Sequence, residues 1–375
     1  MIGLADGRAP RLAALATALP GEVVRQEDAR RLVTALFQDQ LANEDQRLFA
    51  VFENTGIEKR HICMPLEWYA ADHDFGERNT LYIEHALALA SRAIRDVLAR
   101  ASLEPGDVDH LVFVSSTGLA TPSLDARLAN ALGLRGDVRR TPIWGLGCAG
   151  GAAGLARARD FALADPGARV LLVSLELCSL TFQRREVTRR NLVATSLFSD
   201  GAAAALVLGA QARDPARAAG GGAARAGRAL LLLAAHSTLW PDTLDVMGWE
   251  VDAGGLHVVF SRDIPSIVRD WVRPNLDAFL AAHGLDLETL THVIAHPGGP
   301  KVLSAYATSL GLPAQAFRHS AAVLRDCGNM SSPTCLFVLE RALAAGDIEE
   351  GDTAVLAALG PGFASEYVLM RGATA

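Results

Sequence analysis

The sequence lacks the features that mark several protein classes. Its 375 residues include only five cysteines, which are widely spaced and form no CxxC pair. A disulfide framework or a common zinc site is therefore not expected, and we expect no metal. An odd number of scattered thiols fits a reducing cytoplasm. There is no Walker loop, so a nucleotide-phosphate cradle of that type is unsupported.

Excess positive charge and long apolar runs are also missing. The net charge is −7 and the pI about 5.8, which argues against nucleic acid as a main partner. No apolar run approaches the ~20 residues of a membrane span, so no stable membrane insertion is expected. Hydrophobic residues make up 50% of the chain, enough for a large core. The length suggests two domains or one duplicated domain.

Short β-type runs alternate with helical patterns in both halves of the chain. The predicted strands are 110–117, 170–175, 202–209, 230–237, 291–295 and 354–359, and the main predicted helices are 83–98, 124–132 and 267–283. Residues 212–228 are rich in Ala, Gly and Arg and have no apolar period, which is typical of a linker. The pattern predicts an α/β duplication with halves 1–211 and 229–375.

Cys148 lies between a β-type run with glycines and a run of small residues. The pattern predicts a strand, a sharp turn and a helix that begins near the cysteine. The positive end of a helix dipole would favour a thiolate there, which would make Cys148 a nucleophile. The alternative is a buried, inert cysteine on a small-residue packing face.

His296 ends a short apolar strand and is followed by Pro-Gly-Gly-Pro. That places it at a strand's C-terminal end, where α/β proteins hold their chemistry. The alternative is a loop histidine before a turn. Asn329 follows Gly328 and precedes a helix, so it is either a turn or capping asparagine or a donor to a developing oxyanion. One nucleophile, one imidazole and one amide, far apart in sequence, predict a triad that the fold assembles.

Five segments match the signatures of one family, in the family's order. They are Gly147-Cys-Ala-Gly-Gly, Leu197-Phe-Ser-Asp-Gly, His296-Pro-Gly-Gly-Pro, Gly328-Asn-Met-Ser-Ser-Pro and Gly360-Pro-Gly-Phe. Over nearly its whole length the chain resembles the thiolase superfamily, and within it the type III polyketide synthases, which are chalcone-synthase-like. The His-Pro-Gly-Gly turn separates this branch from the carrier-protein-dependent ketosynthases of fatty-acid initiation.

The resemblance implies an α/β fold of the thiolase-like, duplicated αβαβα type with five layers, and a homodimer. It implies no cofactor, because acyl-CoA and malonyl-CoA are substrates. A starter acyl group would move to Cys148, and malonyl-CoA would lose CO₂ while His296 and Asn329 stabilise the enolate. The enolate would attack the acyl thioester, and repeated rounds would give a chain that cyclises.

The resemblance also implies a passage between the coenzyme A tunnel and the cavity. Phe198 matches a gatekeeping phenylalanine, although an ordinary core aromatic would give the same sequence. The second gatekeeper aligns with Val258, and this smaller side chain predicts a wider passage. The gatekeeper pattern of the plant enzymes is therefore not kept, which disfavours a bulky aromatic starter.

The cavity wall is assigned in the same way. Cys178 and Thr181 match positions where plant enzymes usually carry threonines, and a sulfur there makes the wall more apolar. Ser331, Gly360 and Pro361 complete the predicted pocket. The segment with Cys178 is similar to that of bacterial enzymes that make alkylpyrones or alkylresorcinols. A long fatty acyl starter is therefore expected.

Three basic residues are candidates for the phosphates of coenzyme A: Lys59, Arg60 and Lys301. Arginine and lysine suit phosphate, but Lys59 and Arg60 could equally be a solvated surface pair. Thr121, before Pro122, matches a dimer loop that reaches into the partner's cavity.

Two other activities could use the same triad. One is a ketoacyl synthase III-like enzyme that elongates once and takes its substrate from an acyl carrier protein. The other is a Cys-His-Asn thioester hydrolase, which would release free acids with water. Starter length, number of extensions and pyrone or resorcinol ring closure depend on the cavity and are not fixed by the motifs.

Overall fold

The computed structural model describes residues 6–37, 45–215, 228–261 and 263–374. The predicted linker 212–228 falls mainly on residues 216–227, which lie outside the described part of the chain. The five cysteines are all free thiols.

Strands and helices alternate along both halves. The strands are β1 (Arg11–Ala18), β2 (Glu22–Arg25), β3 (Lys59–Ile62), β4 (His110–Val114), β5 (Arg139–Ile143), β6 (Arg169–Leu177), β7 (Asp200–Leu208), β8 (Arg228–Leu239), β9 (Met247–Asp252), β10 (Gly255–Phe260), β11 (His292–Ala295), β12 (Thr353–Gly360) and β13 (Ala364–Thr374). The α-helices are α1 (Gln26–Phe37), α2 (Phe75–Ala101), α3 (Leu124–Leu132), α4 (Gly150–Ala164), α5 (Arg189–Leu197), α7 (Ile264–Ala281), α8 (Pro300–Leu310), α9 (Arg318–Cys327) and α10 (Thr334–Ala345). Short 3₁₀ turns include η3 (Asp45–Phe52), η4 (Leu66–Ala70), η6 (Gly147–Ala149) and η7 (Cys178–Thr181).

The main sheet is mixed and has the strand order β11-β12-β13-β8-β1-β7-β6-β4-β5. Its N-terminal half runs from β1 to β5 and its C-terminal half from β11 to β8. The halves meet through only two residue pairs, Arg11 with Leu231 and Leu12 with Leu230. Parallel pairing occurs in both halves, between β4 and its neighbours and between β11 and β12. Each half is therefore a sheet of its own, joined to the other at one corner.

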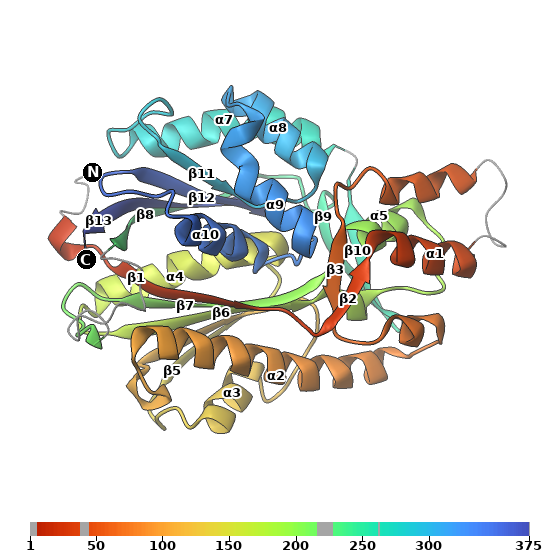
Figure 1. Ribbon diagram of the computed structural model, residues 1–375, viewed down its shortest axis with the longest axis horizontal. Helices are drawn as coiled ribbons and strands as arrows, with labels where there is room; N and C mark the ends of the chain where they lie inside the picture. The colour runs from red at the N-terminus through yellow and green to blue at the C-terminus, as the bar shows by residue number, and fades with distance from the viewer. Residues whose placement is uncertain (1–5, 38–44, 216–227, 262, 375) are drawn as a thin grey trace.

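Helices and sheet halves stack in five layers, as Figure 1 shows from top to bottom. Helices α7 and α8 cover the C-terminal half, and α2 and α3 cover the N-terminal half. Between the two halves lie α4 and α10, whose buried residues share one apolar cluster with both sheets. All nine residues of β7 are buried, as a strand covered on both faces requires. The predicted five-layered, thiolase-like α/β fold is confirmed.

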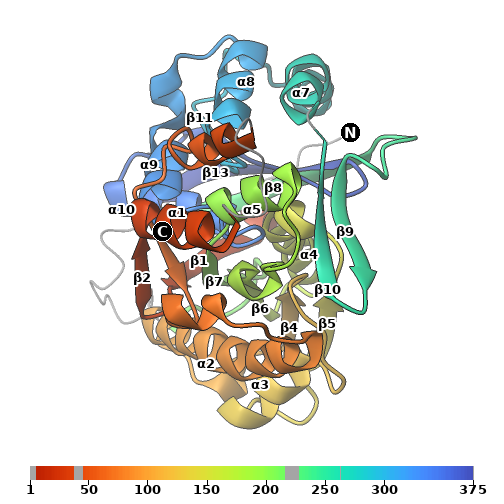
Figure 2. The same cartoon turned by 90° about the vertical axis from the view of Figure 1, so that its right-hand side faces the viewer.

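Several elements were missing from the sequence prediction. They are α1, α5, the paired strands β2 and β3, and the hairpin of β9 and β10. These elements gather at one end of the molecule, on the right of Figure 1, and this end faces the viewer in Figure 2. It is the end that builds the pocket described below.

A membrane-spanning helix and a metal-binding cluster are both absent from the described residues. No helix there combines the length and the apolar content that a bilayer span requires. In the same part of the chain, no group of three or more His, Cys, Asp or Glu side chains is arranged to hold a metal ion.

Candidate active site

Cys148 lies on η6, the turn between β5 and the first residue of α4, as the sequence pattern predicts. The preceding Gly145 and Gly147 have φ of 91° and 46°, a region in which glycine is unstrained. The cysteine is 5% exposed, and its Sγ donates to Ser331 Oγ at 3.6 Å. The thiol therefore points into the protein, toward the segment that carries Asn329.

A buried carboxylate supports the cysteine loop from the other side. Glu176 accepts hydrogen bonds from the Ser116 amide and the Thr117 hydroxyl, both at 2.8 Å, and from the Ser332 hydroxyl at 2.9 Å. The Ser116 hydroxyl in turn accepts from the amides of Gly145 and Gly147 at 3.2 Å. Burial raises the pKa of Glu176 to about 7. Sequence reasoning missed this network, because no motif marks it.

Asn329 follows α9 and is almost fully buried. Its Oδ1 accepts from the Ser331 amide at 2.8 Å, and its Nδ2 donates weakly to the Gly298 carbonyl at 3.4 Å. One acceptor is thus engaged, and the amide N–H groups contact the Gly298 carbonyl and the Cys148 thiol. This geometry places the donor side of the amide where a substrate oxygen at the thiol can bind.

His296 lies one residue beyond the end of β11, where its amide donates to the Ala357 carbonyl at 2.8 Å. The imidazole is buried, and neither ring nitrogen has a hydrogen-bond partner among the described residues. Gly298, on the same turn, accepts from Asn329. The three predicted residues therefore belong to one site, linked from Cys148 through Ser331 and Asn329 to the His296 turn.

The protonation states differ from the expected resting thiolate. Burial raises the pKa of Cys148 to about 11, although its bonds to Ser331 and Asn329 lower it. Burial lowers the pKa of His296 to about 4. At neutral pH both groups are therefore uncharged. A neutral imidazole has one nitrogen that can accept a proton and one N–H that can donate to a developing oxyanion.

The Gly360-Pro361 turn packs directly on the cysteine loop. A Cβ on Gly360 would lie 2.5 Å from the Leu146 carbonyl oxygen, and one on Gly147 would lie 2.8 Å from Pro361. Only glycine fits at these two contacts. Gly360 and Pro361 thus brace the nucleophile loop and, with Ser331, do not line the apolar pocket that was predicted to include them.

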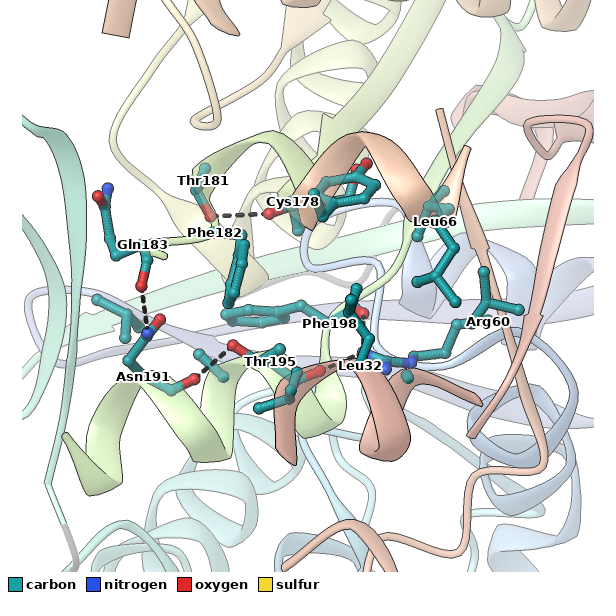
Figure 3. A pocket seen from close by; sticks show the side chains of 18 of the residues that line it. Leu32, Arg60, Leu66, Cys178, Thr181, Phe182, Gln183, Asn191, Thr195 and Phe198 are labelled. Atoms are coloured by element: carbon teal, nitrogen blue, oxygen red, sulfur yellow. Dashed lines mark hydrogen bonds between the residues drawn. The ribbon is translucent and has the colours of Figure 1, made fainter. Parts of the chain in front are cut away.

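An apolar pocket that is open to solvent at its mouth adjoins this site through Phe198. Four residues predicted to line a pocket do so together: Phe198, Cys178, Thr181 and Val258. Much of the remaining wall was missed by the sequence analysis and comes from α1, η4, α5 and β9, and it includes Val24, Ala29, Leu32, Val33, Leu66, Phe182, Asn191 and Trp249. Figure 3 shows α1 and α5 side by side below the pocket and η7 above it.

Phe198 stands where the pocket meets the triad. Its backbone pairs with Asn329, and its ring lies 5.6 Å from that of Phe260. Val258 pairs across the hairpin with Trp249, and both side chains line the pocket. Trp249 and Phe260 thus lie close to the two gatekeeper positions, and the wider passage expected from Val258 stays a prediction.

The candidate phosphate ligands lie in different surroundings. Lys59 on β3 and Lys301 on α8 are exposed, and their contact with coenzyme A stays a prediction. Arg60 is only 5% exposed, and its guanidinium donates to the Phe198 carbonyl at 3.0 Å. Such burial is not the position expected of a phosphate ligand. Thr121 is exposed on the loop between β4 and α3 and does not line the pocket.

Comparison with known proteins shows the family of the chain. Models of the N-terminal and C-terminal domains of chalcone and stilbene synthases match residues 3–212 and 231–374. A putative chalcone synthase of Bacillus subtilis is 42% identical over 95% of this chain and 96% of its own length. A 1,3,6,8-tetrahydroxynaphthalene synthase of Streptomyces peucetius is 42% identical over 97% of this chain and 93% of its own.

A solved structure adds the same conclusion for the fold. The tetrahydroxynaphthalene synthase of Streptomyces coelicolor, a bacterial type III polyketide synthase, superposes with a TM-score of 0.89 at 33% identity and covers 97% of this chain and 100% of its own. With both domain models matched and full-length relatives above 40% identity, the chain belongs to the chalcone and stilbene synthase family and is a type III polyketide synthase, an acyltransferase.

Proposed function

We propose that this synthase condenses an aliphatic, preferably long-chain, acyl-CoA starter with malonyl-CoA and cyclises the product to an alkylpyrone or alkylresorcinol. The observation that carries the proposal is the apolar pocket that Phe198 and Cys178 line. An alkyl chain gains about 0.8 kcal/mol for each methylene that it buries in such a site. Coenzyme A thioesters enter as substrates, and no cofactor takes part.

The loading step uses Cys148 and His296. The thiol gives its proton to the imidazole, and the sulfur attacks the thioester carbonyl of the starter. Coenzyme A leaves as a thiol after taking up that proton, and the acyl group stays on Cys148. The low pKa of His296, about 4, makes the imidazolium a strong acid toward the departing sulfur.

The extension step uses the two hydrogen-bond donors. Malonyl-CoA loses its carboxylate as CO₂, and the remaining electron pair forms an enolate. The His296 N–H and the Asn329 amide stabilise the enolate oxygen, and each such donor typically contributes about 2.7–4 kcal/mol. The enolate carbon then attacks the acyl thioester and displaces the Cys148 thiolate, ready for reloading.

The names of the relatives support a second candidate. Tetrahydroxynaphthalene synthases are among the most similar proteins. Their name indicates a polyhydroxylated aromatic product without an alkyl tail. On this alternative malonyl-CoA alone would serve as starter and extender. A carrier-protein-dependent synthase and a hydrolase are further alternatives, with one elongation or a free acid as the product.

A graded series of acyl-CoAs with malonyl-CoA tests the proposal, with products identified by mass spectrometry. We expect kcat/KM to rise with chain length until the pocket is full. Leu32→Trp should shorten the longest starter accepted, because Leu32 lines the pocket. Ala35→Trp is the matched control, since Ala35 lies on the exposed face of the same helix. Equal use of all lengths, or full product from malonyl-CoA alone, would overturn the aliphatic starter.

We also propose a homodimer that forms along β5. This strand is at the edge of the sheet, and edge strands usually need cover. Trp144 is 49% exposed and Leu119 44% exposed beside it, and the Trp144 indole N–H donates to the Gly118 carbonyl at 3.2 Å. Thr121 on the same loop would then approach the partner's site. Light scattering should give twice the chain mass of 39.6 kDa, whereas a fully active monomer would contradict the dimer.

A further inference from the structure

Arg60 is a buried arginine at the end of a helix that leads into the active site. Its guanidinium donates to the carbonyl oxygens of Thr195 and Phe198, the second at 3.0 Å. These carbonyls lie at the C-terminal end of α5, where a helix leaves carbonyls unpaired and its dipole is negative. Figure 3 shows Arg60 reaching from the far wall of the pocket toward Thr195 and Phe198. Arg60 therefore closes this helix end with a positive charge.

The segment that Arg60 holds is bonded on both sides of Phe198 to Asn329. The backbone N–H of Asn329 donates to the Leu197 carbonyl, and the backbone N–H of Ser199 donates to the Asn329 backbone carbonyl, both at 2.9 Å. The stem of Arg60 also packs against Gly328, the residue before Asn329, because a Cβ on Gly328 would lie only 3.0 Å from Arg60 Cγ. Arg60 thus contacts both Phe198, through its carbonyl, and Gly328, which precedes Asn329.

Two further hydrogen bonds, both through the Ser199 hydroxyl, join β3 to the same segment. The Ser199 hydroxyl donates to the His61 carbonyl at 2.8 Å and accepts from the His61 amide at 2.9 Å. Burial lowers the pKa of Arg60 to about 10, while the charge of Asp200 opposes that shift. The guanidinium is therefore still charged at neutral pH. Both hydrogen bonds come from one nitrogen, Nη1, while the buried Nε has no hydrogen-bond partner among the described residues.

We propose that Arg60 is a positioning residue for decarboxylation, which holds the side-chain amide of Asn329 and the ring of Phe198 in place. On this proposal Arg60 is not a ligand of the coenzyme A phosphates. The proposal rests on the proposed role of Asn329. Cys148 is on a different element, η6, and is supported separately through Ser116. Loss of Arg60 should therefore slow decarboxylation of malonyl-CoA much more than acylation of Cys148.

The test compares Arg60→Met and Arg60→Lys with Arg25→Met. Arg25 is an exposed arginine on β2, opposite Lys59, and serves as the matched control. Acylation and decarboxylation are measured separately, with coenzyme A thioesters and with N-acetylcysteamine thioesters, which carry no phosphate. We expect kcat for decarboxylation to fall roughly 10- to 100-fold in Arg60→Met with either thioester, the scale of a small misplacement. Arg60→Lys should recover part of it, because lysine keeps the charge but not the fork.

Ser199→Ala provides a second test of the proposal if the Arg60→Met protein does not fold. It removes both hydrogen bonds between the Ser199 hydroxyl and His61 on β3 and leaves the Arg60 guanidinium in place. We expect the same selective loss of decarboxylation on a smaller scale. A rise in KM for coenzyme A thioesters alone would mark Arg60 as a phosphate ligand and overturn the proposal. Equal loss of acylation and decarboxylation would show a general structural role and overturn it as well. Normal decarboxylation by Asn329→Ala would instead overturn the proposed function.

Discussion

Replacing Cys148 with alanine abolishes both the acyl-enzyme and the product, and this is the largest effect we expect of any single substitution. The side chain is the only thiol that the structure joins directly to Ser331 and the Asn329 segment among the described residues. Without the thiol the starter acyl group cannot form a thioester with the enzyme, so turnover should fall by roughly 10⁴-fold or more. The measurement is release of coenzyme A together with product formation.

Cys178→Ala is the matched control for Cys148→Ala. Cys178 is also buried, and burial raises its pKa well above the usual value, but it lies on the pocket wall at η7. Its loss should change starter preference and leave the acyl-enzyme intact. Stable acylation of the Cys148→Ala protein, located by peptide mapping, would show that another residue carries the chain.

Replacing Asn329 with alanine slows decarboxylation of malonyl-CoA by roughly 10²-fold or more, the usual result of losing one oxyanion donor. The amide Nδ2 makes a long 3.4 Å bond to Gly298 and contacts Cys148, so it is placed to bind the thioester oxygen of a substrate at the thiol. Acylation of Cys148 should change far less, because that step uses His296. The measurement is release of CO₂ from malonyl-CoA in the absence of a starter.

The control for Asn329→Ala must separate the donor from the turn. Asn329 Oδ1 also accepts from the Ser331 amide at 2.8 Å, a bond that shapes the backbone. Asn329→Asp keeps that acceptor and removes the donor, so it should decarboxylate as slowly as the alanine variant. A near-normal rate in Asn329→Asp would show that the residue only forms the turn.

The triad could be predicted from the sequence because its signals are local. Glycines at positive φ before Cys148, the strand end at His296 and the Gly328-Asn329 turn each require particular residue types. The α/β duplication followed from strand and helix periodicity, whereas the five layers were implied by the family resemblance alone. Protonation was predicted wrongly, because the burial that raises the pKa of Cys148 arises from packing between distant segments.

The pocket and Arg60 show what sequence patterns could not reveal. Helix α1 was not predicted from the sequence, yet its Leu32 and Val33 line the pocket. Trp249 entered the site only through its pairing with Val258 on the β9–β10 hairpin. Arg60 was read as accessible because charged residues usually are. The carbonyls that hold it inside come from residues far away in the sequence.

The central claim is that an aliphatic acyl group on Cys148 is extended by units derived from malonyl-CoA. Mass spectrometry of the peptide that contains Cys148, after rapid quenching with a long-chain acyl-CoA and malonyl-CoA, tests it most directly. The account predicts a series of adducts on Cys148, the starter acyl group followed by the same group lengthened by successive two-carbon ketide units. Adducts built from malonyl-CoA alone, or an unextended acyl group released as free acid, would contradict it.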